Sequence, residues 1–464
     1  MSRRSFSEFR PVDNHVALYL QLADEIQRRI SEGELKAGDR LPSHRELAST
    51  LGFNVTTITR AFAALHRRGL VSSRPGRGSV ITGPTSTIAF ASAPESATGL
   101  IDLSVNRPAT GAYLDSLAQL LPRLPKDPRY SALQDFHAPE GPIWARETLA
   151  TWLAPTLGVN DPGCVVITHG AQSALGCVLG AIARAGDVVL ADAITYQGVA
   201  ALCRSLEIEL RPVAMDDAGL QPEALDVACA EHQPRALFVV PCLHNPTAIT
   251  LSKERRERIV EIARRHNMLI VEDDVYRPLV EDAPPAFARM APEQTIYITS
   301  LSKSVAPGLR YGAAVAPAAR VADIAAMQRI ACWSVSPLNA LIATRLIEDG
   351  TLAQIIAAQN AELRARQGIL RECLAGFDVL TADASTHAWL RLPSPWRANI
   401  FVTVAREHGV VVLSADQFAL GQHAVPHAVR INLAAARSRS DLRRGLESLV
   451  EVMRNGERHM SSLV

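Results

Sequence analysis

One lysine, Lys303, stands in a stretch of the chain where small hydroxyl and cationic side chains gather at short spacing. Ser300 and Ser302 precede it, and Arg310 follows seven residues later across a Pro-Gly turn. A lysine amine can condense with an aldehyde as a Schiff base, while hydroxyls and a guanidinium can bind a phosphate dianion. The stretch therefore fits a pyridoxal phosphate site, although such a string also occurs as an ordinary solvated loop. The other parts of such a site should then lie upstream, at the ends of strands.

Length and charge indicate a second, different module. A chain of 464 residues is too long for one ordinary core and predicts two or three domains. The net charge of +1 is unevenly spread, since residues 1–83 hold 13 Lys and Arg against 8 Asp and Glu. A basic N-terminal segment on a mildly acidic remainder predicts a polyanionic partner for that segment alone.

The cysteines and the apolar runs place the chain in a general class. Seven scattered cysteines without a C-x-x-C pair indicate neither a disulfide framework nor a zinc site. We expect idle thiols in a reducing cytoplasm and no metal. Apolar runs such as 236–243 are far shorter than the roughly 20 residues that span a bilayer, and no secretory signal precedes them. We therefore expect a cytoplasmic protein that does not contact a membrane.

The first eighty residues carry the period of amphipathic helices. Apolar residues recur every four positions at Leu18, Leu22, Ile26 and Ile30. A second helix should begin at Ser43, because Ser43 and Glu46 have the spacing of a capping box, and should end at Leu51. A third should run from about Val55 to Arg68. Its inward residues are Ile58, Phe62 and Leu65.

Two short β-like segments, Leu70–Ser73 and Ser79–Thr82, follow these helices. Three helices and a basic two-stranded wing form the winged helix-turn-helix layout, whose third helix enters the major groove of DNA. Each polar residue there, taken singly, is more often a solvated surface group, but the ordered set favours DNA binding. The residues that we expect to meet base edges or phosphates are Arg45, Thr56, Thr57, Thr59, Arg60, Arg77 and Gly78.

This segment resembles the GntR-type DNA-binding domain over about residues 14–82. The resemblance rests on Leu18–Gln21, on the run from Gly33 to Ala48, and on Gly69–Val71 with Gly76–Ser79. One departure is the string Phe53-Asn54-Val55, where that family usually has valine, serine and arginine. The arginine at the head of the recognition helix is therefore missing, which leaves the preferred operator open.

A linker and an α/β domain follow. Residues 83–99 are rich in Ser, Thr, Ala, Pro and Gly and read as a linker. From Ile101 onward, apolar β-like runs alternate with helical stretches, which predicts a parallel α/β sheet. The expected strands are 164–168, 188–191, 236–240 and 268–271, and the helices are 171–185, 198–206 and 253–266. Ligands gather at the C-terminal ends of such strands.

The residues at those strand ends suit the cofactor that Lys303 suggests. Gly170, Ala171 and Gln172 start a helix after the first strand, where backbone N–H groups can bind a phosphate. Tyr196 can stack on a pyridine ring. The remaining candidates are Asn245 and Tyr276, for the ring's phenolic oxygen, and Asp273, which would keep the pyridine nitrogen protonated. Each residue is a weak signal alone, because a core tyrosine or a polar turn explains it equally well. Their occurrence in one order, each at a strand end, is a stronger signal.

Residues from about 100 to 455 resemble the fold type I, class I/II aminotransferases, with a large sub-domain at about 140–335. The resemblance implies a Schiff base at Lys303, and it gives Asp273, Asn245, Tyr276 and Tyr196 the roles just named. It implies that Ser300, Ser302, Arg310 and the turn Gly170–Gln172 hold the phosphate. Arg430 falls where the family grips the substrate's α-carboxylate, for which an arginine fork is suited. The segment Asn106-Arg107-Pro108 is a further candidate for the pocket wall.

Three residues depart from that pattern. Ala171 replaces a serine or threonine of the phosphate turn, and Ala248 replaces the glycine of the usual Asn-Pro-Thr-Gly. Phe136 aligns where the family offers a tyrosine to the neighbouring subunit's phosphate. The loss of two hydroxyls should weaken phosphate binding, while the lysine and Arg310 remain.

The two halves together resemble the MocR subfamily of bacterial regulators. That resemblance implies a head-to-tail homodimer, double-stranded operator DNA as a partner, and a pyridoxal phosphate site that senses an amino acid or amine through aldimine exchange at Lys303. An active aminotransferase with a DNA-binding head is one alternative, since Lys303, Asp273 and Arg430 are all present. A regulator that senses free pyridoxal phosphate, as a vitamin B6 switch, is the other. The sequence names neither the effector nor the operator.

Overall fold

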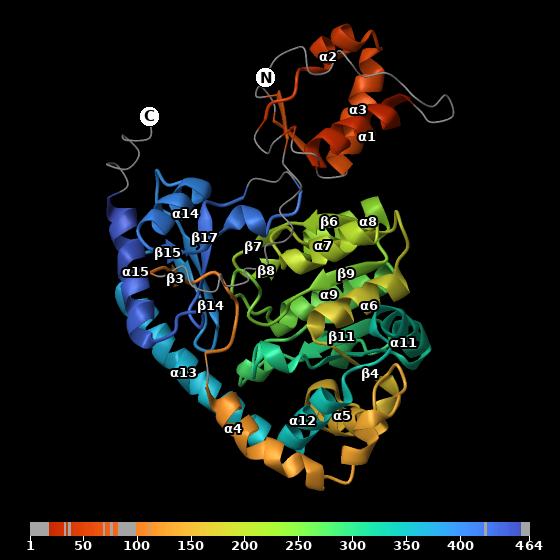
Figure 1. The fold of residues 1–464 in the computed structure, drawn as a ribbon, viewed down its shortest axis with the longest axis vertical. Helices are drawn as coiled ribbons and strands as arrows, with labels where there is room; N and C mark the ends of the chain where they lie inside the picture. Colours follow the sequence, from red (N-terminus) through yellow and green to blue (C-terminus); the bar gives the residue numbers. More distant parts are fainter. Residues whose placement is uncertain are drawn as a thin grey trace. The chain divides into compact units, whose positions relative to one another are not determined.

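The structure is a computed structural model, and it describes residues 18–31, 34–35, 39–67, 70–74, 78–81, 99–109, 111–421 and 425–455. The chain divides into two compact units, Met1–Phe90 and Ala91–Val464 (Figure 1). Most of the predicted linker, residues 83–98, lies outside the described residues, as does Arg77 of the predicted DNA-binding set.

The described residues of the N-terminal unit form three helices and a two-stranded antiparallel sheet, in the order that the sequence predicted. Its elements are α1 (Leu18–Ser31), α2 (His44–Leu51), α3 (Val55–Arg67), β1 (Val71–Arg74) and β2 (Gly78–Ile81). The capping box is confirmed, because Ser43 Oγ accepts from Glu46 N and Glu46 Oε2 accepts from Ser43 N at 2.9 Å. The predicted inward residues pack together in one core, with Leu22, Ile26, Ile58 and Leu65 fully or almost fully buried.

A seven-stranded sheet forms the centre of the second unit. Its strands are β4 (Val165–Thr168), β5 (Val188–Asp192), β6 (Glu209–Val213), β9 (Ala236–Val239), β10 (Leu269–Asp273), β11 (Thr295–Ser300) and β12 (Gly312–Val315), in the order β4-β12-β11-β10-β9-β5-β6. The prediction of a parallel sheet was wrong for one strand, since β12 runs antiparallel to both β11 and β4. After β11 the chain reverses through the short helix η6 (Pro307–Leu309) and Arg310, whose φ is +49°, and returns beside the strand it has left.

Helices cover both faces of this sheet. On one face lie α6 (Ala171–Ile182), α7 (Gln197–Ser205) and α11 (Ala318–Cys332). On the other lie α5 (Ile143–Leu157) and α12 (Pro337–Glu348) at one end, and α8 (Pro222–His232), α9 (Lys253–Arg265) and α10 (Phe287–Met290) at the other. Because both faces are covered, the central strands are apolar on both sides and carry their polar residues at their ends.

The C-terminal part of the unit forms a second, antiparallel sheet. It holds β13 (Val379–Leu380), β14 (His387–Arg391), β17 (Ala428–Asn432) and β16 (Leu413–Ser414), in that order. Beside it pack α13 (Thr351–Cys373), α14 (Ala398–Glu407) and α15 (Arg439–Arg454). The short strand β3 (Ile101–Asp102) pairs with β15 (Val410–Val411), so the segment after residue 99 lies with the C-terminal sheet (Figure 1).

The remaining elements are short connections. They are α4 (Ala112–Leu120), η2 (Leu121–Lys126), η3 (Tyr130–Gln134), η4 (Pro162–Cys164), β7 (Met215–Asp216), β8 (Gly219–Leu220), η5 (Arg277–Leu279) and η7 (Ala415–Gln417). All seven cysteines are free. Within the described part of the chain, no helix combines the length and the apolar character that crossing a bilayer requires.

Candidate functional site

Three neighbouring strands bring the predicted phosphate-binding residues to one edge of the large sheet. Gly312, at the start of β12, pairs with Ser300 at the end of β11 and with Thr168 at the end of β4. A Cβ atom at Gly312 would lie 2.7 Å from Thr299 O and 2.8 Å from the Cα atom of Gly170. Glycine is therefore required there for the Ser300 loop and the Gly170 turn to approach each other, a requirement that the sequence analysis missed.

The Gly170 turn forms a cradle with the shape and charge that an anion requires. Gly170 has a φ of +89° and precedes α6, whose first turn has no side-chain cap among the described residues. Arg310 Nη2 donates to His169 O at 2.5 Å, which holds the guanidinium across this turn. A Cβ atom at Gly170 would lie 3.4 Å from Arg310 Nη2. Free N–H groups, a helix N-terminus and an arginine together suit a phosphate, even though Ala171 adds no hydroxyl.

The two serines before the lysine contact each other. Ser300 Oγ lies 2.9 Å from Ser302 Oγ and 3.0 Å from Tyr311 O, and it accepts from Ser302 N at 3.1 Å. Ser300 is buried, whereas Ser302 is half-buried. Ser300 thus fixes the loop, and Ser302 is the hydroxyl that remains partly accessible beside Lys303.

Lys303 lies inside the domain with its amine on a backbone carbonyl. Its Nζ donates to Asn106 O at 2.7 Å. Burial, together with the positive charges of Arg430 and Arg310, lowers the pKa of Lys303 to about 8, although the Asp273 carboxylate opposes this shift. At pH 7 about a tenth of such an amine is neutral, compared with less than about a thousandth for an ordinary lysine. A neutral amine is the nucleophile that Schiff-base formation needs.

Asp273 is a buried acid with an unused oxygen. It is the last residue of β10, and its Oδ1 has no hydrogen-bond partner among the residues that the structure describes. Burial first, and the neighbouring Asp274 charge second, raise the pKa of Asp273 to about 7. A cationic ring N–H would pair with this carboxylate and supply the missing partner. The donor set and this orphaned atom therefore fit pyridoxal phosphate.

A pH-dependent stability follows for the cofactor-free protein. The unfolded carboxyl has its ordinary pKa of 3.8, so between about pH 4 and pH 7 the folded chain holds a proton that the unfolded chain has released. The contribution of Asp273 to stability therefore falls as the pH rises through this range. Asp273→Asn should remove that fall and should make the cofactor-free protein more stable than wild type at pH 8, by at most about 4 kcal/mol, but not at pH 4. Urea unfolding at both values measures it.

The matched control for that measurement is Asp217→Asn, because the Asp217 side chain is mostly exposed. The control should follow wild type at both pH values. An Asp273→Asn protein that tracks wild type at pH 8 as well as at pH 4 would contradict the assignment of a raised pKa to this carboxyl.

Tyr196 and Gln172, predicted for different roles, contact each other. The Tyr196 hydroxyl donates to Gln172 Oε1 at 2.9 Å, and Gln172 Nε2 donates to Gly198 O at 3.3 Å. The Gln172 side chain therefore holds the tyrosine in place, and only its backbone N–H remains for an anion. Burial raises the pKa of Tyr196, so its hydroxyl stays protonated.

Arg430 and Asn245 are joined although they lie 185 residues apart. Arg430 Nη1 donates to Asn245 Oδ1 at 2.8 Å, and Nη2 donates to Ser104 O at 2.5 Å. Burial lowers the pKa of Arg430 to about 10, and its Nε has no partner within the described part of the chain. The guanidinium lies 4.9 Å from the centre of the Phe418 ring, which in turn packs edge-on against Trp389. Trp389 thus packs against the Phe418 ring that the arginine contacts.

Tyr276 contacts Asn106, which the sequence analysis named only as part of the segment Asn106-Arg107-Pro108. Its hydroxyl accepts from Asn106 Nδ2 at 2.6 Å. Its ring lies 5.6 Å from that of His387. Phe136, by contrast, is not among these residues: it is 90% exposed and contacts the Trp333 ring at 5.8 Å. Neither His387 nor its neighbour Thr386 carried a sequence signal, because both follow an irregular loop.

In the N-terminal unit, the predicted DNA-binding residues flank the start of α3. Arg45, Thr56, Thr59 and Arg60 are exposed, while Thr57 is half-buried. Asn54 was missed, and its Oδ1 accepts from Thr56 N and lies 2.9 Å from the Thr56 hydroxyl. Asn54 therefore caps the helix that would read DNA, and a capping residue at this position is its only sequence signal.

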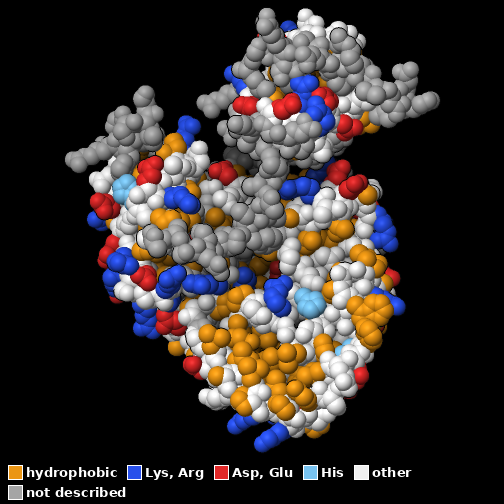
Figure 2. Space-filling model, viewed as in Figure 1, with side chains coloured by type: hydrophobic (Ala, Val, Ile, Leu, Met, Phe, Trp, Pro, Cys, Tyr) orange, Lys and Arg blue, Asp and Glu red, His pale blue; other side chains and the backbone are white. Residues whose placement is uncertain are grey.

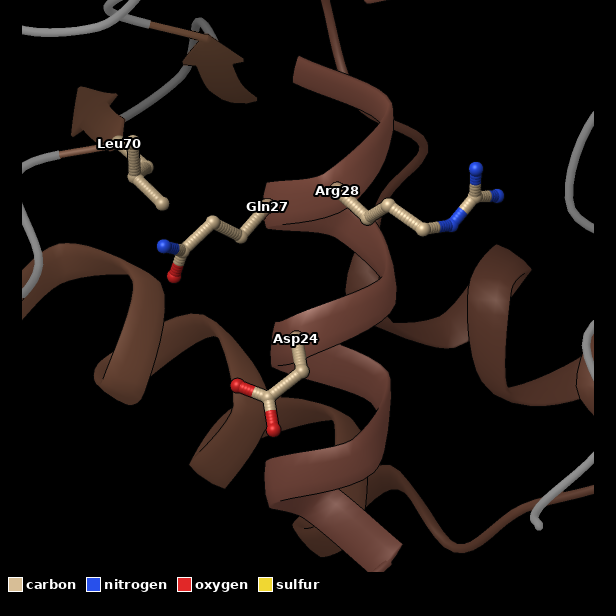
Figure 3. Close-up of a pocket in the computed structure, with 4 residues that line it drawn as sticks. All are labelled: Asp24, Gln27, Arg28 and Leu70. Atoms are coloured by element: carbon tan, nitrogen blue, oxygen red, sulfur yellow. The ribbon is translucent and has the colours of Figure 1, made fainter. Parts of the chain in front are cut away.

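A shallow hollow of about 570 Å³ lies on the N-terminal unit beside α1 (Figure 3). Asp24, Gln27 and Arg28 of α1 line it together with Leu70. Figure 3 shows the Asp24 carboxylate and the Arg28 guanidinium on successive turns of one helix. An acidic side chain in the lining makes this hollow a poor surface for DNA phosphates, and the start of α3 is the better candidate.

Comparison with known families agrees with this division into two modules. Residues 98–449 match the family model described as aminotransferase class I and II. The chain belongs to that family. Residues 18–81 match the model for bacterial regulatory proteins of the gntR family. A GntR-type head on an aminotransferase-like domain is the MocR-type architecture, so the predicted recognition and fold class are confirmed.

Relatives along nearly the whole chain carry the names of regulators. The HTH-type transcriptional regulator YdeF of Bacillus subtilis is 28% identical over 92% of this chain and 93% of its own. The vitamin B6 salvage pathway transcriptional repressor PtsJ of Salmonella typhimurium is 29% identical over 89% and 94%. The pyridoxine biosynthesis regulator PdxR of Corynebacterium glutamicum is 25% identical over 86% and 88%.

Solved structures that share the fold of the second unit include aminotransferases. The α-aminoadipate aminotransferase LysN of Thermus thermophilus, solved with N-(5'-phosphopyridoxyl)-L-leucine, has a TM-score of 0.71 and 22% identity, covering 79% of this chain and 94% of its own. Aspartate aminotransferase of the same organism has a TM-score of 0.68 and 22% identity, covering 76% and 92%. At this identity the likeness establishes the fold.

Proposed function

We propose that this protein is a bacterial transcription regulator that binds pyridoxal phosphate at Lys303 and responds to an amino acid or amine entering that site. One observation carries the proposal. Lys303, the orphaned Asp273 carboxylate and the uncapped start of α6 meet at one edge of a sheet, in a chain that also carries a winged helix-turn-helix. Because its target would be chromosomal DNA, we place its action in the cytoplasm.

The chain's own residues would divide the binding of this cofactor among them. Arg310, Ser302 and the N–H groups of the Gly170–Gln172 turn would hold the phosphate, with Ser300 fixing the loop. Asp273 would hold the proton of the ring nitrogen, and Asn245 and Tyr276 would donate to the ring's phenolic oxygen. Tyr196 would stack on the ring. Pyridoxal phosphate supplies an aldehyde carbon that exchanges one amine for another and a ring that withdraws electrons.

Arg430 would select effectors that carry a carboxylate. Its charge is buried, and its position is fixed by Asn245 and Ser104. An effector that binds there and to Lys303 could favour one arrangement of the DNA-binding heads over another only by binding the two arrangements with different affinity. The proposal therefore requires that operator affinity and effector affinity change together.

A second copy of this chain is the proposed protein partner. In Figure 2, hydrophobic side chains gather on the lower part of the second unit, over the region where Figure 1 labels α4, α5 and α12. Large exposed hydrophobic residues on these and adjoining elements are Leu114, Leu121, Tyr130, Ile143, Leu338 and Phe136. An exposed apolar area of this kind favours association, and a dimer would present two heads to a two-fold symmetric operator.

The test combines two readings on the full-length protein. Footprinting on genomic fragments would identify an operator, and anisotropy would then follow its affinity while pyridoxal phosphate and single amino acids are added. We expect a change only when both cofactor and one effector are present. An operator affinity that never responds to either would contradict the proposal. Conversion of the amino acid to its oxo acid with an added acceptor, at ordinary enzyme rates, would instead support an aminotransferase.

The names of two relatives favour a second candidate, a regulator that senses the cofactor itself. PtsJ and PdxR are both named for vitamin B6 pathways. In that case pyridoxal phosphate alone would change operator affinity, and amino acids would add nothing further. The same titration therefore separates the two candidates.

The DNA-binding face predicts a measurable effect at α3. Arg60→Ala should weaken binding by about tenfold and should reduce the slope of log affinity against log salt by about one, because one phosphate contact is lost. Anisotropy at several salt concentrations measures both. Arg28→Ala, on α1 beside the hollow of Figure 3, is the matched control and should leave the slope unchanged. Equal slopes for Arg60→Ala and wild type would remove Arg60 from the interface.

A further inference from the structure

Asn106 uses its side-chain amide and its backbone carbonyl in four contacts. Its Nδ2 donates to the Tyr276 hydroxyl at 2.6 Å, and its backbone oxygen accepts from Lys303 Nζ at 2.7 Å. Its Oδ1 accepts from Thr386 Oγ1 at 3.1 Å and from Asn432 Nδ2 at 3.0 Å. A half-buried asparagine that uses donor and acceptors on both sides is held in one orientation.

The four partners come from two different sheets. Lys303 and Tyr276 follow β11 and β10 of the seven-stranded sheet, whereas Asn432 ends β17 and Thr386 precedes β14 of the C-terminal sheet. Thr386 and Asn432 are fully buried. Asn106 itself lies between β3 and α4, on the segment that pairs with the C-terminal sheet through β15. The residue therefore bridges the lysine and the tyrosine on one side and the C-terminal sheet on the other.

His387 forms a second contact in the same direction. Its Nδ1 lies 3.1 Å from Thr386 Oγ1, and its Nε2 lies 3.0 Å from His244 O, one residue before Asn245. Its ring packs against Tyr276. Tyr276 is thus held by an amide from Asn106 and by a ring from β14, so movement of the C-terminal sheet would move the tyrosine hydroxyl.

We propose that Asn106 is a positioning residue that sets the Tyr276 hydroxyl and the Lys303 amine relative to each other and links both to the C-terminal sheet. This inference rests on the proposed function, because the two groups matter as a pair only when the cofactor lies between them. Asn106 belongs neither to the predicted cofactor-binding residues nor to the predicted effector carboxylate site, so this positioning role is additional to both.

Asn106 O offers a hydrogen-bond acceptor to the Lys303 amine when that amine is displaced from the cofactor. Pyridoxal phosphate would supply an aldehyde carbon at which an incoming amine could replace Nζ, and Lys303 would then be a free amine that has gained the two hydrogens given up by the incoming nitrogen. The freed Nζ is then a donor again, and Asn106 O is the acceptor that it contacts in this structure. Asn106 also orients Tyr276 and contacts Thr386 and Asn432. Release of the lysine would therefore change the contacts between Asn106 and the C-terminal sheet.

The first test uses the absorbance of the loaded protein against pH. Asn106 Nδ2 makes the Tyr276 O–H a stronger donor, because a hydrogen bond to the phenol oxygen polarises it. That donor would hold the cofactor's phenolic oxygen and lower the pH midpoint of the lysine-linked chromophore. Asn106→Ala should therefore raise the midpoint, by about half a unit to one unit. In a Tyr276→Phe background the same substitution should shift nothing.

The background comparison separates positioning from packing. Charged groups that face Lys303 are Asp273, Arg310 and Arg430, and all are kept in every variant. Asn339→Ala is the control, since Asn339 is also a partly buried amide but donates to Leu309 O at 3.0 Å, outside this network. It should leave the midpoint unchanged. An equal shift by Asn106→Ala with and without the Tyr276 hydroxyl would overturn the proposal.

The second test needs no cofactor. Thr386→Val should lower the melting temperature of the cofactor-free protein by about 1–3 °C in wild type. The loss should be clearly smaller in an Asn106→Ala background, where only the contact of Thr386 with His387 remains to be lost. A full loss in both backgrounds would refute the link to the C-terminal sheet. If wild type binds no pyridoxal phosphate at all, the proposed function fails, and this cycle still decides whether Asn106 couples the two sheets.

Discussion

Lys303→Ala should abolish covalent attachment of pyridoxal phosphate and, with it, every response of the protein to an amine. Borohydride reduction of the loaded wild-type protein should fix one cofactor on the peptide that contains Lys303, and mass spectrometry should find no such adduct in the variant. The visible absorbance band of the lysine-linked cofactor should disappear at the same time. Affinity for the cofactor should fall at least about 100-fold, because a covalent bond is lost and only non-covalent contacts remain.

The physical reason is the setting of this lysine rather than its presence alone. Its pKa of about 8 and its contact with Asn106 O place a partly neutral amine at the sheet edge. Lys253→Ala is the matched control, because Lys253 is an exposed lysine on α9 that lies 3.7 Å from Glu257. Its removal should leave both the adduct and the absorbance unchanged. An adduct that survives in Lys303→Ala at another lysine would move the site elsewhere.

The sequence predicts the two modules through two different kinds of signal. The prediction of the three helices of the head rests on local signals, such as the four-residue period of α1 and the Ser43–Glu46 capping box. Such signals depend only on residues that are close in sequence. The strand-end residues rest on the order of elements along the chain, because parallel strands bring their C-terminal ends to one edge. Both kinds of information are local or ordered in sequence, so both were accessible.

The contacts between distant segments were not accessible in this way. The antiparallel direction of β12 depends on the chain reversal after Lys303. The short apolar sequence of β12, Gly312–Val315, does not indicate in which direction the strand runs. Thr386 lies 280 residues from Asn106, and Asn432 lies 326 residues away, and no periodicity connects them. The sequence could name Asn106 as a wall of the pocket, but its partners come from a sheet whose placement only the fold determines.

One of these distant contacts ties together two roles that the sequence had kept separate. Arg430 was predicted for the effector's carboxylate and Asn245 for the cofactor's ring oxygen, yet the two side chains are hydrogen-bonded. A carboxylate that binds Arg430 must share the guanidinium with Asn245 Oδ1 and Ser104 O, or displace one of them. Binding of the carboxylate would then change how Asn245 is held. The carboxylate of an effector would thus be coupled to the proposed cofactor contact through the single side chain of Arg430.

Arg430→Lys should therefore remove the preference for amino acids over amines. Glycine and methylamine form a matched pair of probes, because they differ by one carboxylate. With the loaded wild-type protein, an absorbance titration should give a clearly higher affinity for glycine, and the variant should reduce the ratio of the two affinities by about 10- to 100-fold. A lysine keeps the charge but loses the planar fork, and a charge-assisted bidentate pair contributes about 1.5–3 kcal/mol.

The substitution is conservative so that the fold survives. Removing the buried charge altogether would leave Asn245 Oδ1 and Ser104 O without their donor and would confuse a loss of recognition with a loss of structure. Arg391→Lys is the control, because Arg391 lies at the surface in ion pairs with Asp217 and Asp378 and should not affect the ratio. Affinity for methylamine should stay nearly constant throughout. A glycine-to-methylamine ratio that Arg430→Lys leaves intact would mean that the carboxylate is bound elsewhere, and Arg430 would then serve only to hold Asn245.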